Sequence, residues 1–235
     1  MPTLRPETVA QFRPLADLVP DHWTTGSTVA GDGTSLHWTD TGGDGPPVVL
    51  LHGVQVDGLS WLRTAQALEA DHRVVMPDLR GHGRSGRIDA PVPPQITVDD
   101  MVTVLAAAGV DEPIVIGHSM GADVAGRLAA QHAVRGLVLV DPALRQMPAP
   151  MFDVDDPPPW MAEVFDTLRA LPALLLVTAR PMFPGADIET DVTAFTKHWR
   201  DGRHVHVADS GHAIPADQFD RFIEVVTGFI AALKS

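Results

Sequence analysis

The segment Gly117–Gly121, which reads Gly-His-Ser-Met-Gly, has the composition and spacing of a nucleophilic serine on a sharp turn. The apolar run Ile114–Ile116 before it predicts a buried strand, and a helix-like stretch follows at once. Because a residue on such a turn leaves room only for small neighbours two positions away, Gly117 and Gly121 fit the requirement. A helix N-cap is the structural alternative for this serine. We predict that Ser119 is the nucleophile of an acyl-transfer reaction.

A nucleophilic serine needs a base, and His212 has the most suitable surroundings among the eleven histidines. A flexible glycine precedes it, the run His204–Val207 predicts a strand upstream, and Gln218–Leu233 predicts the last helix downstream. We therefore predict that His212 accepts the proton from Ser119. Structural roles are expected for the other histidines near motifs, which are His52, His82, His118, His204 and His206.

Short runs rich in valine, leucine and isoleucine predict the strands that must position these groups. They are Pro47–Leu51, Arg73–Met76, Pro113–Ile116, Gly136–Val140 and Ala173–Val177, with a weaker run at His204–Val207. Helix-like stretches lie between them at Ser60–Leu68, Val98–Ala108, Gly121–His132 and Gln218–Leu233. Continuous apolar runs indicate strands that are covered on both faces, so we predict an α/β fold with a doubly wound, mostly parallel sheet. Two antiparallel strands, His22–Ala30 and Ser35–Thr39, are expected before it.

Four separated motifs resemble those of the α/β-hydrolase family over nearly the whole chain from Trp23 onward. Besides the serine turn, they are the His-Gly pair that ends Leu50–Gly53, the loop Pro77–Ser85, which matches D-x-R-G-x-G-x-S, and the histidine loop Asp209–Pro215. The resemblance implies the serine-acid-histidine order of that fold. It also implies that Asp78, Arg80 and Arg84, in the loop Pro77–Ser85, brace the sheet rather than bind an anion.

The resemblance further implies an oxyanion hole and an orienting acid. The backbone amides of Met120 and Val54 would bind the oxyanion. In most family members the acid ends a V-x-G-x-x-D pattern, but here that position is Met182. Because some members carry the acid one strand earlier, we predict Asp141, which follows Gly136–Val140. Two later aspartates, Asp187 and Asp191, stay open as alternatives.

A proline-rich stretch breaks the alternation of strands and helices. Its prolines are Pro148, Pro150, Pro157, Pro158 and Pro159, and this density prevents a long helix. We expect residues 146–171 to form a short cap or an acidic surface loop, inserted into a core made of residues 1–145 and 172–235. Trp160 and Phe165 in it are expected to line the substrate pocket with Gln55 and Trp61. A core position is an equal alternative for Trp61, and a role as buried anchors is an equal alternative for Trp160 and Phe165. The methionine and tryptophan content favours a small, fairly apolar ester or lactone.

Composition limits the partners. The 235 residues carry a formal charge of −13, which disfavours nucleic acid and anionic membranes as partners. They contain no cysteine and no apolar run of membrane-spanning length, so a soluble cytoplasmic protein is expected. The sequence Thr97–Asp100 is interpreted as a helix N-terminus rather than a carboxylate pair. We expect no nucleotide cofactor and no metal, although His204, His206 and Asp209 form the one cluster worth testing.

Two rival functions stay open. The same fold supports other chemistry on a serine turn, such as a perhydrolase, a C–C bond hydrolase or a cofactor-free enzyme. A ligand-binding protein on a hydrolase shell is the second rival, and the methionine at the usual acid position, Met182, is the feature that favours it.

Overall fold

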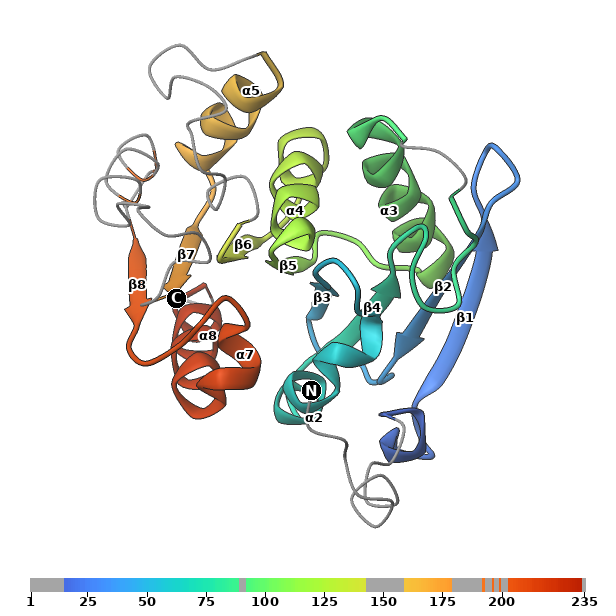
Figure 1. The fold of residues 1–235 in the computed structure, drawn as a ribbon, viewed down its shortest axis with the longest axis horizontal. Helices are drawn as coiled ribbons and strands as arrows, with labels where there is room; N and C mark the ends of the chain where they lie inside the picture. The colour runs from blue at the N-terminus through green and yellow to red at the C-terminus, as the bar shows by residue number, and fades with distance from the viewer. Residues whose placement is uncertain are drawn as a thin grey trace, which may run out of the picture.

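The computed structural model describes residues 15–88, 92–142, 159–178 and 203–233, together with Val192, Thr196 and Trp199. An eight-stranded sheet runs through this part of the chain in the order β1-β2-β4-β3-β5-β6-β7-β8 (Figure 1). Its strands are β1 (Thr24–Val29), β2 (Ser35–Asp40), β3 (Pro47–Leu51), β4 (Arg73–Asp78), β5 (Ile114–His118), β6 (Gly136–Val140), β7 (Ala173–Thr178) and β8 (His204–Val207). The pairings β1–β2 and β2–β4 are antiparallel and the others are parallel, so the predicted fold class is confirmed.

Helices cover both faces of this sheet. They are α2 (Leu62–Leu68), α3 (Pro94–Ala108), α4 (Met120–Gln131), α5 (Pro159–Leu168), α7 (Ile214–Asp217) and α8 (Phe219–Ala232), with short 3₁₀ turns η1 (Leu15–Leu18) and η2 (Gly58–Trp61). In Figure 1, α3, α4 and α5 lie on one side of the sheet, and α2, α7 and α8 lie on the other. The predicted start of α3 at Val98 is wrong. The helix begins at Pro94, because a proline at the first helical position has no N–H that would need a partner.

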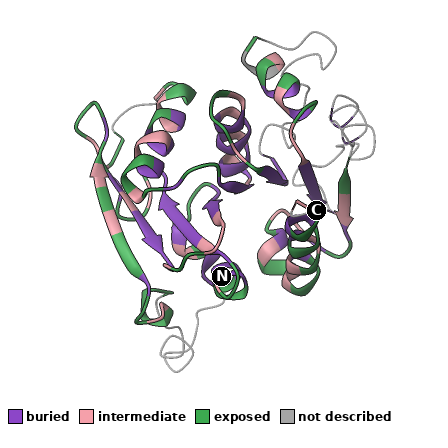
Figure 2. Ribbon diagram, turned by 180° about the vertical axis from the view of Figure 1, so that it is seen from behind, coloured by how far each residue is buried: buried purple, intermediate pink, exposed green. Residues whose placement is uncertain are grey.

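The two cores explain why the strands have continuous apolar sequences. Alternate residues of each central strand point to opposite faces, so in β3 Val49 packs with α3 and α4 while Val48 packs with α2 and α8. The central strands are accordingly buried on both faces, and the helices expose only their outer sides (Figure 2). Packing on both faces holds the central strands in place, and so it also positions the residues at their carboxyl ends.

The described part of the predicted insertion is the helix α5, which packs on α4. Val164 and Phe165 of α5 are buried in the same core as α4, and Val164 lies against Gly126. The part of the predicted insertion over residues 146–158 lies outside the described residues. No helix in the described ranges is long and apolar enough to cross a membrane.

Candidate active site

The serine turn has the strained geometry that its sequence predicts. Ser119 joins β5 to α4 with φ 54° and ψ −119°, and its side chain makes no capping hydrogen bond to the helix. A Cβ atom on Gly117 would lie 2.2 Å from the carbonyl oxygen of Gly121, and one on Gly121 would lie 2.3 Å from that of Leu51. Both positions therefore need glycine, which confirms the packing argument made from the sequence. The Ser119 hydroxyl is left free to interact outside its helix.

Three side chains that are far apart in the sequence form one hydrogen-bonded line. The Oγ atom of Ser119 lies 2.8 Å from Nε2 of His212, and Nδ1 of His212 lies 2.6 Å from Oδ2 of Asp141. Because a carboxylate only accepts, Nδ1–H donates to Asp141, and Nε2 is left to accept from the serine hydroxyl. Asp141 is fully buried and Ser119 is 4% exposed. This arrangement can take a proton from the hydroxyl and stabilise the imidazolium that results.

Asp141 reaches His212 because of its place at the carboxyl end of β6. Its backbone N–H donates to Leu176 of β7, and the N–H of Ser119 donates to Val140, each at 2.9 Å. Backbone bonds therefore tie Asp141 to β7, and Ser119 to the end of β6 directly before Asp141. The structure thus places the predicted acid against the predicted base. The alternatives Asp187 and Asp191 lie outside the described residues.

The loop that carries His212 is held by a residue that the sequence did not indicate. Thr178, the last residue of β7, donates its hydroxyl to the carbonyl of Ser210 at 2.9 Å, and its N–H lies 3.5 Å from Oδ1 of Asp141. Ser210 in turn donates its hydroxyl to Val207 of β8 at 2.7 Å. Thr178 therefore contacts both the acid and the histidine loop. The only indication of this role in the sequence was the position of Thr178. It comes directly after a predicted strand, within the segment that departs from the V-x-G-x-x-D pattern.

Two backbone amides beside Ser119 are available for an oxyanion. Within the described chain, the N–H groups of Val54 and Met120 donate to no acceptor. The loop of Val54 is fixed by His52, whose Nε2 accepts from the N–H of Leu79 at 2.9 Å and whose Nδ1–H donates to Gly53 at 2.7 Å. Burial lowers the pKa of His52, so the ring stays neutral and can play both parts. His52 therefore has a structural role, because it ties the loop that carries Val54 to Leu79.

The loop after β4 braces the sheet edge. Asp78 accepts from the N–H groups of Gly58 and Arg84 at 2.8 and 2.9 Å. Burial raises the pKa of Asp78, but hydrogen bonds from His37 and from these amides outweigh burial and leave the pKa lowered. Asp78 thus remains a carboxylate that ties η2 to its own loop.

Arg80 in the same loop makes a buried ion pair with helix α3. Its guanidinium donates two bonds of 2.7 Å to Asp100, and Arg80 also reaches Asp32 at 2.6 Å. The interpretation of Thr97–Asp100 as a helix N-terminus is therefore wrong, because α3 starts earlier and Asp100 serves as the partner of Arg80. The predicted bracing role of the loop is confirmed.

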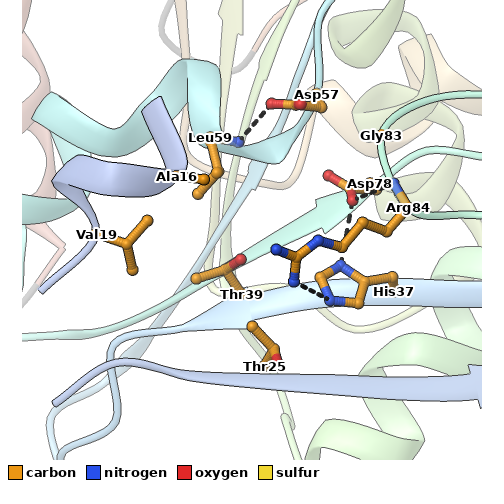
Figure 3. Close-up of a pocket in the computed structure, with 10 residues that line it drawn as sticks. All are labelled: Ala16, Val19, Thr25, His37, Thr39, Asp57, Leu59, Asp78, Gly83 and Arg84. Carbon is orange, nitrogen blue, oxygen red and sulfur yellow. Dashed lines mark hydrogen bonds and ion pairs between the residues drawn. The ribbon is translucent and has the colours of Figure 1, made fainter. Parts of the chain in front are cut away.

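A cavity of about 340 Å³ opens beside this loop, and Figure 3 shows the residues that line it. His37 forms its polar wall, with Nδ1 3.2 Å from Asp78 and Nε2 3.4 Å from Arg84. Val19 and Leu59 lie on its apolar side. None of its lining residues belongs to the serine, histidine and aspartate line, so the cavity is not the space in front of the nucleophile.

The predicted substrate-contacting residues lie in different surroundings. Gln55 is exposed on the oxyanion loop with φ 65°. Trp61 is 2% exposed and packs on Phe222, and Phe165 is 2% exposed between α5 and α4. Both rings thus belong to the two cores that cover the sheet. The side chain of Trp160 lies outside the described residues.

The rings of His204 and His206, the pair considered for a metal site, lie against each other edge to face. The centroids of His204 and His206 are 5.6 Å apart in an edge-to-face geometry. Over the described ranges, no group of three or more histidine, aspartate or glutamate side chains could hold a metal ion.

Known proteins match both the sequence and the fold. A family model described as the alpha/beta hydrolase fold matches residues 46–186. A non-heme haloperoxidase of Rhodococcus erythropolis is 29% identical over 189 residues, and lipase LipV of Mycobacterium tuberculosis is 41% identical over 116 residues. The matches cover 74% and 46% of this chain, but less than two thirds of each relative, 66% and 42%.

Solved structures show the same architecture. An esterase from Exiguobacterium antarcticum superimposes with a TM-score of 0.71 and 19% identity, over 89% of this chain and 99% of the esterase. At this identity the similarity concerns the fold alone. Together with the match of the family model over more than half of the sequence, it establishes that this chain belongs to the α/β-hydrolase family.

Proposed function

We propose that the protein is a serine hydrolase that cleaves a small, fairly apolar ester or lactone through an acyl-enzyme on Ser119. The observation that carries the proposal is the line from Ser119 through His212 to Asp141, with distances of 2.8 and 2.6 Å. The strained backbone of Ser119 supports it, because strain of this kind concentrates at functional sites.

The first half of the reaction forms the acyl-enzyme. Oγ of Ser119 attacks the acyl carbonyl while its proton passes to Nε2 of His212, and Asp141 stabilises the imidazolium. The N–H groups of Val54 and Met120 bind the oxyanion of the tetrahedral intermediate. When the intermediate collapses, the bond to the leaving alkoxide breaks, and His212 returns the proton to that oxygen. The alcohol leaves, or stays attached as the opened chain of a lactone.

The second half releases the acid. A water molecule gives its proton to Nε2 of His212 and attacks the acyl carbon. The second tetrahedral intermediate collapses with breakage of the bond to Oγ, and the proton on His212 returns to Ser119. No residue or reagent beyond water is consumed, so the site is restored.

The surroundings of the oxyanion loop support an apolar acyl group. Val54 and Val56 are 58% and 45% exposed on that loop, although both side chains are apolar. Relatives named as esterase and lipase support ester hydrolysis. The absence of cysteine from the sequence supports our further proposal of a cytoplasmic location.

Perhydrolysis is a second candidate, and the haloperoxidase relative favours it. Hydrogen peroxide would then replace water in the second half and release a peracid from the same acyl-enzyme. A ligand-binding role is disfavoured, because the carboxylate of Asp141 lies 2.6 Å from Nδ1 of His212 although the usual acid position in the sequence is a methionine, Met182.

The decisive experiment combines turnover of p-nitrophenyl esters of increasing chain length with labelling by a fluorophosphonate probe. We expect Ser119→Ala to abolish labelling and to reduce kcat/KM by about 10³-fold or more. Ser27→Ala, on the exposed face of β1, is the matched control and should behave as the wild type. Full turnover in Ser119→Ala would refute the proposal. Adding hydrogen peroxide to the acyl-enzyme and measuring peracid separates the two candidate reactions.

A further inference from the structure

His118 has a contact that the proposed mechanism does not use. It is the last residue of β5, directly before Ser119, and its Nε2 lies 2.8 Å from the backbone carbonyl oxygen of His212. The rings of His118 and His212 are 4.8 Å apart with 43° between their planes. The neighbour of the nucleophile in the sequence is therefore also the neighbour of the base in space.

The chemistry of this contact fixes which nitrogen of His118 carries the proton. A carbonyl oxygen only accepts, so Nε2–H of His118 must donate to His212. Burial lowers the pKa of His118 to about 4, so its ring is neutral near pH 7 and carries a single N–H. The other nitrogen, Nδ1, therefore has no proton.

The ring of His118 also fills the space on the side of the oxyanion loop. A Cβ atom on Gly53 would lie 3.0 Å from Nδ1 of His118 and 3.3 Å from the Cβ of Ser119. His118 thus lies between Gly53, directly before the proposed donor Val54, and the loop of His212. One ring touches both sides of the site.

We propose that His118 is a positioning residue, which holds the loop of His212 at the correct distance from Ser119 by donating Nε2–H to the His212 carbonyl. The inference rests on the proposed function. The bonds from Thr178 and Ser210 and the bond from the N–H of Gly211 to Asp217 hold this loop upstream of His212, and the bond from His118 acts on His212 itself. Since His118 and Ser119 are adjacent in the chain, the bond ties the base directly to the turn that carries the nucleophile.

The neutral state of His118 suits this position during turnover. His212 becomes a cation in each half-reaction, and a charged ring 4.8 Å away would oppose that step. A neutral ring restrains the backbone of His212 without charge repulsion. The restraint acts on proton transfer rather than on substrate binding, so its loss should lower kcat more than it changes KM.

Two variants of nearly equal length test the inference. His118→Gln keeps an N–H donor close to the place of Nε2, whereas His118→Met removes the donor and keeps similar bulk. With p-nitrophenyl butyrate, we expect His118→Met to lose about 10- to 100-fold in kcat with KM within about threefold of the wild type. His118→Gln should recover most of that loss, and fluorophosphonate labelling rates should follow the same order.

The controls separate the possible failures. A structural role alone would lower the Tm of the two variants while leaving the rate per folded molecule unchanged in both, and that result would overturn the inference. Equal losses in kcat for Met and Gln would also overturn it. If Ser119→Ala keeps its turnover, the proposed function itself fails, whatever residue 118 shows. Should His118→Met not fold, ¹⁵N-histidine NMR of the wild type gives the answer, since a proton on Nδ1 of His118 would contradict the proposed bond.

Discussion

Asp141 lies at the end of β6, yet its carboxylate accepts a bond of 2.6 Å from Nδ1 of His212, which follows β8. Thr178 on the intervening strand bridges the gap, because it contacts both Asp141 and the loop of His212. The carboxylate of Asp141 therefore reaches His212 from a strand that is not adjacent to β8, which precedes the loop of His212. Because only Asp141 is shown against His212 in the described chain, we expect the loss of activity on removal of a carboxylate to be specific to this residue.

We predict that Asp141→Asn reduces kcat by about 10³- to 10⁴-fold, because an amide can donate to Nδ1 and favour the wrong tautomer of His212. Steady-state kinetics with a p-nitrophenyl ester measure the effect. Asp187→Asn and Asp191→Asn are the controls and should change kcat by less than about threefold. A large loss in either control, with Asp141→Asn active, would assign the acid elsewhere.

The buried ion pair between Arg80 and Asp100 predicts an effect on stability. Asp100 is 2% exposed, so Asp100→Asn leaves the guanidinium of Arg80 short of one buried charge partner. We expect the free energy of unfolding to fall by about 3 kcal/mol in urea denaturation. The neighbouring Asp99 is exposed, and Asp99→Asn should change stability by less than about 0.5 kcal/mol. Equal effects at the two positions would count against the ion pair.

The glycines differ in what an added methyl group would meet. A Cβ on Gly121 would lie 2.3 Å from a backbone carbonyl oxygen, so Gly121→Ala should destabilise the serine turn and lower labelling by the fluorophosphonate probe. In α8, a Cβ added to Gly228 would have nothing within 4 Å. Gly228→Ala should therefore raise stability by about 0.5–1 kcal/mol, as alanine favours a helix interior. Thermal unfolding of both variants measures the two opposite changes in stability. A Tm and a labelling rate of Gly121→Ala equal to those of the wild type would contradict the prediction.

The lowered pKa of His118 predicts a loss of stability in acid. Its folded pKa is about 4 against an ordinary value of 6.5, so between these values the unfolded chain binds more protons than the folded one. Stability should be greatest above pH 6.5 and decline as the pH falls, until His118 also protonates near pH 4. The loss from this group amounts to about 3 kcal/mol.

The variant His118→Gln isolates that loss, because it has no titrating ring at this position. Urea denaturation at roughly pH 4.5, 5.5 and 7 should give a shallower decline in the free energy of unfolding for the variant than for the wild type. His52 also has a lowered pKa and adds to the decline in both proteins. If the free energies of unfolding of the two proteins declined in parallel with falling pH, the pKa of His118 would not be lowered by burial.

Features that depend on local rules could be predicted from the amino-acid sequence. Continuous apolar runs predicted the central strands, because a strand covered on both faces has no polar side. The serine turn was readable because Ser119 needs glycine on each side within two residues, a requirement that lies in consecutive positions. The surroundings of His212, between a strand and the last helix, were equally local.

Contacts that depend on strand order and on the paths of loops became visible only in the folded chain. Nothing near Asp141 or Thr178 in the sequence specified that β6 and β7 lie side by side with their ends directed at one histidine loop. The bond from His118 to His212 and the ion pair from Arg80 to Asp100 join residues 94 and 20 positions apart. Such contacts arise only when packing of the whole sheet brings distant segments together, because no short-range pattern encodes the distance between them.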